Sequence, residues 1–510
     1  MNAIRWSTGL LPCALGCVLL VSFPASAQAP QGDFGAFIEQ ARRDWDVPGV
    51  AVAVVKDDKV VFVQGYGVRT QGQPGAVDAD TAFQLASVTK IFTAAALGAL
   101  VDEGKLGWDD PVLGHLPGFA MSDPYATLHT TARDLLAHRS GLPAFGGELL
   151  NELGYTRSEV LRRLQYVKSV GSFREKAGYS NLGYALAGTL AGQVDGASWE
   201  AVVRSRLLGP LGMKRTQVVV ADLDRDPNAA SAYLSRLAGL TLVTTRESDG
   251  AFAPAGAMSS SANDMAIWMR MLLAGGSFEG KQVLQAKTVQ ELFRPAMASS
   301  PGFAEAPPIN VETGFDYALG WNIYHYNGHK IVEKGGALAG VRAVVTLVPS
   351  EHLGVVVLAN LNLTLLPEVI RARVLEDYLG PSGQDLSTEF RQQRDALAQL
   401  VATVDAPPKL PLGPLPRPLN VYVGVYENEL YGRLAVVREG EGIAVKAGPA
   451  CYRGSLRHEG QDAFDLAWPR PNSLPGTAAF TLDAAGQAIR FETEDYGVFV
   501  RVERTARDCS

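Results

Sequence analysis

Short apolar runs alternate with polar residues at the two ends of the first 380 residues, and a helical period dominates between them. Residues 49–66 hold two apolar runs around Lys56-Asp57-Asp58-Lys59, a pattern that predicts a β-hairpin. Residues 342–348 and 354–360 predict a second hairpin around the turn residues 349–352. Two hairpins on either side of a mostly helical region predict an α+β domain with one antiparallel sheet.

Between the two hairpins, apolar residues recur about every three or four positions, which is the spacing of one face of an α-helix. The helices predicted from this spacing lie at residues 87–103, 131–138, 157–168, 182–193, 198–208 and 262–273. Residues 88–101 are apolar almost all the way round, so we expect this helix to be buried.

The chain changes character after residue 380. A helical pattern at residues 388–403 is followed by Ala406-Pro407-Pro408 and a Pro-rich stretch, so residues 381–418 predict a helix and a semi-rigid linker. Residues 419–510 consist of short alternating segments with frequent Gly, and this pattern predicts a small all-β barrel or sandwich. The clearest strand segments lie at residues 421–426, 433–437, 478–482 and 497–502.

The N-terminus has the pattern of a secretory signal. Arg5 is the only charge before an apolar run at residues 10–23, and Ala25-Ser26-Ala27 is a small-residue cleavage site. The run is too short to span a membrane comfortably. We therefore predict a signal peptide over residues 1–27 and a periplasmic or secreted mature chain without a membrane span. Lipid attachment at Cys17 is disfavoured, because Cys17 lies inside the apolar run.

Composition excludes several classes of partner. The 510 residues predict two or three domains, and 47% hydrophobic with 19% charged residues is typical of a globular protein. A net charge of -7 without a Lys/Arg run argues against a nucleic-acid partner. The His residues are scattered and no Cys/His cluster has ligand spacing, so we expect no metal site. We also expect no cofactor. Cys451 and Cys509 could form one disulfide in an oxidising compartment, or remain two thiols.

One short motif suggests nucleophilic chemistry. Only one Lys in the chain has a Ser three positions earlier, in Ser87-Val88-Thr89-Lys90. This spacing places both side chains on one helix face, and burial would favour a neutral amine that can take the hydroxyl proton. The alternative is that Ser87 only caps the helix while Lys90 extends outward.

Two further motifs gain meaning from their order after Ser87. Tyr179-Ser180-Asn181 offers a phenol that can shuttle protons and an amide that can orient a carbonyl or hold Lys90. Lys334-Gly335-Gly336 offers a positive charge and room for a substrate backbone. Taken alone, the first could be a core aromatic beside a helix cap, and the second a turn before a strand.

The C-terminal β unit provides an internal control. Tyr426-Glu427-Asn428 and Lys446-Ala447-Gly448 match the same two patterns, without a nearby Ser-x-x-Lys. We interpret them as chance matches. The evidence therefore lies in the order, spacing and context of the three motifs.

In that order, the motifs resemble those of the serine β-lactamase and penicillin-binding-protein superfamily. Residues 34–380 are most similar to its branch of class C β-lactamases, D-aminopeptidases, DD-peptidases and related esterases, and residues 419–510 resemble appended lipocalin-like β domains. Further similar phrases are Gly104-Lys105-Leu106, Asp109-Asp110-Pro111, Arg133-Asp134-Leu135-Leu136-Ala137-His138, Ser140-Gly141-Leu142-Pro143, Pro254-Ala255-Gly256 and Leu319-Gly320-Trp321.

The resemblance implies a β-lactamase-like fold, an antiparallel sheet flanked by helices with an all-helical region, followed by a small all-β domain. It also implies that Ser87 forms an acyl-enzyme while Lys90 and Tyr179 handle protons. The substrate-binding residues would be Asn181, Lys334, Gly336 and Ala337. The backbone N–H groups of Ser87 and Ala337 would form the oxyanion hole, and His138 would be structural.

The third motif departs from the class C pattern. Gly335 stands where those enzymes usually carry a hydroxyl residue that helps to bind the drug's carboxylate. This disfavours a β-lactamase and favours a peptidase, amidase or esterase. Among these we expect a secreted hydrolase of amide bonds in small-molecule or peptide substrates. The alternatives are a carboxylesterase or β-lactamase of the same mechanism, a slow penicillin-binding protein, or a cell-wall binding module. Arg342 could recognise a carboxylate instead, or be a solvated Arg at a strand edge.

Overall fold

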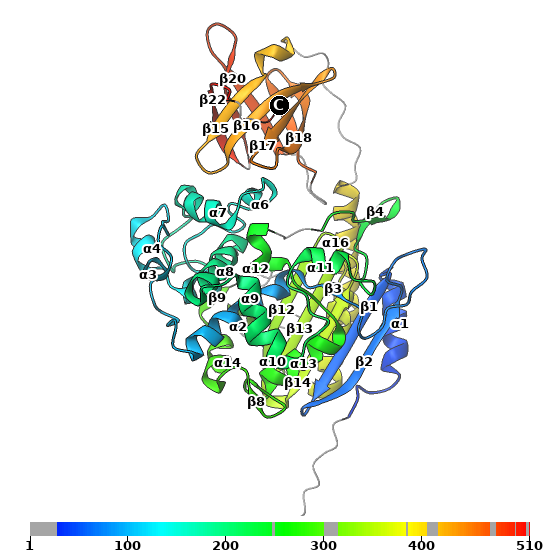
Figure 1. Ribbon diagram of the computed structural model, residues 1–510. Coiled ribbons are helices and arrows are strands. Elements are labelled where there is room, and N and C mark those ends of the chain that lie inside the picture. Colours follow the sequence, from blue (N-terminus) through cyan, green and yellow to red (C-terminus); the bar gives the residue numbers. More distant parts are fainter. Residues whose placement is uncertain are drawn as a thin grey trace, which may run out of the picture.

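The computed structural model describes residues 28–246, 250–299, 315–383, 386–404, 417–469, 476–494, 496–505 and 509. The predicted signal peptide, residues 1–27, lies outside the described residues, as do residues 405–416 of the predicted linker. The described chain forms a larger α+β part and a closed β-barrel, as predicted (Figure 1).

An eight-stranded antiparallel sheet organises the α+β part, in the order β2-β1-β14-β13-β12-β11-β10-β9. Its strands are β1 (Gly49–Lys56), β2 (Lys59–Gly67), β9 (Met297–Ser299), β10 (Phe315–Tyr317), β11 (Asn322–Tyr326), β12 (His329–Leu338), β13 (Val341–Val348) and β14 (Leu353–Ala359). The two predicted hairpins are β1–β2 and β13–β14, and they meet where β1 pairs with β14. Sequences far apart in the chain thus share the centre of one sheet.

Strand β1 shows why both faces of this sheet are covered. Side chains alternate between the faces of a strand, yet all but the last residue of β1 are buried. Val50, Val52 and Val54 pack with α1 (Phe34–Asp44) and α15 (Leu366–Leu379). Ala51, Ala53 and Val55 belong to the larger core on the other face.

The larger core is shared with the helical region. Its helices are α2 (Thr89–Asp102), α3 (Val112–His115), α4 (Pro124–His129), α5 (Ala132–Leu136), α6 (Leu149–Glu152), α7 (Arg157–Arg163), α8 (Asn181–Asp195), α9 (Trp199–Val203), α10 (Gly209–Leu211), α11 (Val220–Asp224), α12 (Ala253–Gly256), α13 (Ala262–Leu273) and α14 (Ala286–Leu292). All helices predicted between the hairpins are present. In α2 every residue from Thr89 to Leu100 is buried, which confirms the expectation of a buried helix.

Three small two-stranded pairs complete this part: β3 (Phe83–Gln84) with β6 (Ser259–Ser260), β4 (Tyr233–Arg236) with β5 (Gly239–Leu242), and β7 (Ser277–Phe278) with β8 (Lys281–Gln282). Helix α16 (Leu386–Val404) follows, at the predicted position. Among the described residues, no helix is long and apolar enough to cross a membrane.

The barrel is closed, because β15 pairs with β22 as well as with β16. Its strands are β15 (Gly424–Asn428), β16 (Gly432–Glu439), β17 (Gly442–Ala447), β18 (Tyr452–Gly460), β19 (Ala463–Ala467), β20 (Gly476–Leu482), β21 (Ala488–Thr493) and β22 (Gly497–Val502). Buried aromatic residues, among them Tyr426, Phe480 and Phe491, contact one another in its interior. A disulfide joins Cys451 to Cys509.

Candidate active site

Ser87 lies in a tight turn directly before the buried helix α2. The turn is the 3₁₀ segment Ala86–Val88, and Ala86 has a φ of +50°, a left-handed conformation that non-glycine residues rarely adopt. One helical turn later, Lys90 Nζ donates a 2.9 Å hydrogen bond to Ser87 Oγ. Lys90 is fully buried and Val88 holds the cap position of α2, so neither part of the capping alternative holds.

Three oxygens surround the Lys90 ammonium. Besides Ser87 Oγ, they are Asn181 Oδ1 at 2.7 Å and the carbonyl oxygen of Ala255 at 3.0 Å. These contacts stabilise the protonated amine, which must lose one proton before it can act as a base toward Ser87. The sequence predicted the contact with Asn181 as one option. It did not predict the contact with Ala255, because a backbone carbonyl leaves no mark in the residue types.

Tyr179 lies between two buried amines. Lys334 Nζ donates to the Tyr179 hydroxyl at 3.1 Å, and Lys90 Nζ lies 4.9 Å from the centre of the Tyr179 ring. Ser180, the middle residue of this motif, caps α8 by accepting from the Gly183 N–H. The cap fixes the start of α8, and with it the position of Tyr179 just ahead of the helix.

The third motif lies inside β12 rather than in a turn ahead of a strand. Gly336 packs directly against the turn that carries Ser87: a Cβ added there would lie 2.2 Å from the Leu85 carbonyl oxygen. Any larger residue would therefore push β12 away from Ser87. Ala337 follows in the same strand, paired with Arg342 of β13. The structure thus brings all three predicted motifs together.

Comparison with known proteins identifies the family. Residues 34–379 match the β-lactamase family. The chain belongs to the β-lactamase family. Residues 412–507, which include the barrel, match a domain of unknown function, DUF3471.

Similar proteins extend this result. "Unguisins hydrolase ungD" of Aspergillus violaceofuscus is 28% identical over 82% of this chain and 78% of its own. "Protein flp" of Staphylococcus aureus is 27% identical over 67% of this chain and 65% of its own. The fold matches that of an octameric penicillin-binding protein homologue from Pyrococcus abyssi, with a TM-score of 0.59 at 22% identity, over 91% of this chain and 99% of that one. The protein is therefore a serine hydrolase of the β-lactamase and penicillin-binding-protein superfamily.

The electrostatics of this β-lactamase-family site keep its histidine neutral. His138 is buried beside Tyr179, with 4.5 Å between ring centres. Burial first, and then the charges of Lys334 and Lys90, hold the pKa of His138 well below its ordinary value of 6.5. Its Nδ1 accepts from the Ser180 N–H at 3.1 Å, so the ring proton is on Nε2. These contacts are those of a neutral histidine that packs against Tyr179.

Glu148 is a residue of the site that the sequence did not reveal. Asn181 Nδ2 donates to Glu148 Oε2 at 3.1 Å, while Asn181 Oδ1 accepts from Lys90. Glu148 is therefore linked to the Lys90–Ser87 pair through hydrogen bonds of Asn181. A single Glu ahead of a short helix carries no pattern that separates it from a surface residue.

Both sequence-based interpretations of Arg342, as a carboxylate receptor and as a solvated strand-edge residue, are wrong. The side chain is buried, and its Nε and Nη2 donate to Glu368 Oε1 at 3.1 and 2.6 Å. Glu368 comes from α15 and is itself fully buried. A guanidinium committed to this carboxylate is neither a solvated group nor a receptor for a substrate carboxylate.

Proposed function

We propose that this serine hydrolase cleaves amide bonds of peptide-like substrates through an acyl-enzyme on Ser87. The observation that carries the proposal is the 2.9 Å contact between Lys90 Nζ and Ser87 Oγ in a site where Ser87 is 5% exposed and Lys90 is fully buried. A nucleophile within hydrogen-bond reach of a base is the arrangement that serine acyl transfer requires.

In the proposed mechanism, Lys90 reacts as the neutral amine: once it has lost one proton to solvent, it accepts the Ser87 proton as Oγ attacks the substrate carbonyl. The backbone N–H groups of Ser87 and Ala337 stabilise the oxyanion, and Gly336 lets β12 come close enough for this. Tyr179, held by Lys334, delivers its proton to the leaving nitrogen and takes up the one that Lys90 received from Ser87. Asn181 orients the substrate carbonyl and Lys90, and water then hydrolyses the acyl-enzyme.

The preference for amides over β-lactams rests on the third motif. Gly335 has no hydroxyl for a substrate carboxylate, and the one nearby arginine considered for that role, Arg342, is paired with Glu368. Ester and β-lactam cleavage use the same residues and remain the second candidate. A slow penicillin-binding protein would acylate Ser87 without turning over.

We further propose that the protein acts in the periplasm or outside the cell, after cleavage behind Ala27. The disulfide between Cys451 and Cys509 supports this, because such bonds persist in oxidising compartments.

Labelling of the nucleophile tests the proposal. A fluorophosphonate or a labelled penicillin should attach to Ser87, as read by peptide mass spectrometry. Ser87→Ala should abolish labelling and lower turnover at least about a thousandfold, or about 4 kcal/mol of barrier. Ser455→Ala, an exposed serine in the barrel, is the matched control and should label normally. Labelling of Ser87→Ala would exclude Ser87 as the nucleophile.

Turnover then separates the substrate classes. A D-amino-acid anilide, a p-nitrophenyl ester and a chromogenic cephalosporin report on amide, ester and β-lactam cleavage. We expect the highest kcat/KM for the anilide. Higher values for either of the others would reassign the substrate class and leave the mechanism in place.

A further inference from the structure

The short helix α6 lies between the candidate active site and the barrel. Besides Ser87, the oxygen partners of Lys90 include Asn181 Oδ1 and the Ala255 carbonyl. Each of them is held from α6. Glu148, the N-cap residue of α6, accepts from Asn181 Nδ2 at 3.1 Å. Asn151 Oδ1, within the helix, accepts from the Phe252 N–H at 3.0 Å.

These two hydrogen bonds determine where the Lys90 partners point. An asparagine amide has a donor end and an acceptor end, so a carboxylate on the NH₂ group aims the carbonyl oxygen at Lys90. Phe252 is the N-cap residue of α12, the helix that contains Ala255. Fixing its N–H fixes the start of α12 and therefore the Ala255 carbonyl. One helical turn thus positions both oxygens.

The C-terminal end of α6 meets the barrel. The Ala450 N–H donates to the Leu153 carbonyl at 2.9 Å. Gly448 is so close that a Cβ added there would lie 2.5 Å from Leu153 Cβ. Two residues later, the Tyr155 hydroxyl donates to the Tyr431 carbonyl at 3.0 Å. Leu153 is itself fully buried in the core, so a shift imposed here is transmitted to α6.

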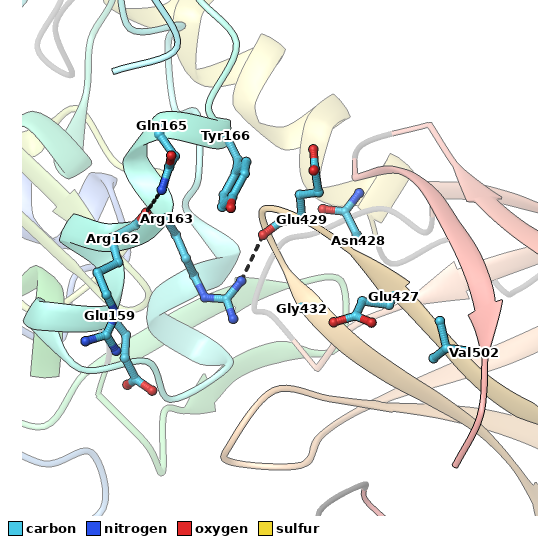
Figure 2. Close-up of a pocket in the computed structure, with 10 residues that line it drawn as sticks. All are labelled: Glu159, Arg162, Arg163, Gln165, Tyr166, Glu427, Asn428, Glu429, Gly432 and Val502. Atoms are coloured by element: carbon cyan, nitrogen blue, oxygen red, sulfur yellow. Dashed lines mark hydrogen bonds between the residues drawn. The ribbon is translucent and has the colours of Figure 1, made fainter. Parts of the chain in front are cut away.

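A second set of contacts continues along α7. Arg163 Nη1 donates to the carbonyl oxygens of Glu429 and Leu430 at 3.0 and 2.8 Å, in the turn between β15 and β16 (Figure 2). Beside it lies a cavity of about 630 Å³, lined by residues of both parts, among them Tyr166 and Glu427. The barrel therefore contacts the segment from Leu153 to Arg163 at several points.

We propose that the C-terminal barrel positions Lys90 through α6, with Glu148 and Asn151 as the positioning residues. This inference rests on the proposed role of Lys90 as the base. The barrel then acts on the acylation step itself, whatever the size of the substrate. Because the two oxygens stabilise the ammonium form of Lys90, their displacement also makes the amine easier to deprotonate.

A pair of glycine variants tests this in the full-length chain. Gly448 and Gly440 both have left-handed φ values, +67° and +59°, so Val strains both backbones alike. A Cβ at Gly448 would press on Leu153, whereas a Cβ at Gly440 would meet nothing within 4 Å. We expect the rate constant for Ser87 labelling to fall at least about tenfold in Gly448→Val relative to Gly440→Val. We also expect the acid limb of its pH profile to move to lower pH, since the ammonium form of Lys90 loses hydrogen-bond acceptors.

A double-mutant cycle identifies the route. If the barrel acts through α6, Gly448→Val and Glu148→Ala impair labelling by the same route. The labelling rate constant of the double variant then falls by less than the product of the two single fold-losses. Independent, multiplicative effects would overturn the proposal. So would equal rates and pH profiles for the Gly448 and Gly440 variants.

Two controls keep the test decisive. If Gly448→Val does not fold, Tyr155→Phe, which removes only the hydroxyl bonded to Tyr431, should still move the acid limb to lower pH; an unmoved limb there would also overturn the proposal. Wild-type protein that fails to label on Ser87 would refute the proposed function. Wild-type labelling with unaffected variants would refute only the role of the barrel.

Discussion

At the scale of single residues, Tyr179 has two separable roles, since its ring packs and its hydroxyl carries a proton. The ring contacts His138 and both buried amines, and these contacts do not need the hydroxyl. Tyr179→Phe should therefore lower the melting temperature by only a few degrees, since the lost hydrogen bond to the Lys334 ammonium costs about 2 kcal/mol. Turnover should fall about a hundredfold or more. Melting curves and steady-state rates on one sample measure both, and unchanged rates would leave Tyr179 with packing alone.

His138 makes stability depend on pH. In the unfolded chain its pKa is near the ordinary 6.5, whereas in the fold burial, Lys334 and Lys90 hold it well below that value. Between the two values the unfolded chain binds more protons, so the free energy of unfolding falls as the pH drops below 6.5, by up to about 1.4 kcal/mol per pH unit.

Replacement of His138 isolates this contribution. His138→Asn keeps an acceptor for the Ser180 N–H but does not titrate between pH 7.5 and 5.5, a window of about two units around the histidine pKa. We expect this variant to be less stable at the upper pH and to lose less stability on acidification than the wild type. Denaturant unfolding at several pH values measures both slopes. Parallel slopes would mean that His138 is not the titrating group.

At the scale of elements, the sequence predicted what local periodicity encodes. The two hairpins and helices such as α2, α8 and α13 follow from apolar spacing, because each buries a whole face or more of its surface. Strands β9 and β10 are three residues each, too short for alternation to stand out from the surrounding sequence. They form because β11 provides an edge with which β10 pairs, and β10 in turn pairs with β9.

The residues of the site also divide into those that the sequence could predict and those that it could not. Ser87, Lys90, Tyr179 and Lys334 could be selected because their order along the chain matched a known family. Glu148 and the Ala255 carbonyl could not, since their contacts with Asn181 and Lys90 join segments that are far apart in the sequence. Arg342 was misjudged for the same reason: its partner Glu368 lies in a helix beyond the next strand.

At the scale of the whole molecule, the barrel could be predicted as a unit but its docking could not. The alternating pattern of residues 419–510 encodes a closed sheet on its own. Its contacts with the helical region use backbone groups of Leu153, Ala450 and Tyr431, together with the absence of a side chain at Gly448. Backbone hydrogen bonds and glycines give the same sequence pattern whether they lie at a free surface or at an interface. A Pro-rich linker between two units predicts that few contacts cross their boundary, whereas the structure contains several.

Removal of the barrel separates two ways in which it could act. In Figure 1 the barrel lies over α6 and α7, on the side of the fold from which α6 holds the Lys90 partners. A chain that ends at Ala406 retains the sheet, the helices and all three motifs, so we expect it to fold and to label on Ser87, more slowly than the full chain. Loss of positioning lowers kcat/KM for short and long substrates by the same factor, as in Gly448→Val.

A barrel that also borders the substrate path changes their ratio as well, because appended domains commonly control access to such sites. We expect the ratio of kcat/KM for a long peptide over a short one to change about tenfold on truncation, which corresponds to about 1.4 kcal/mol of contact. Full-length Gly448→Val is the control for positioning, since it retains the barrel. Equal ratios in the truncated and full-length chains would exclude any effect of the barrel on substrate choice. Insoluble truncated protein would show that the helical region needs the barrel to fold.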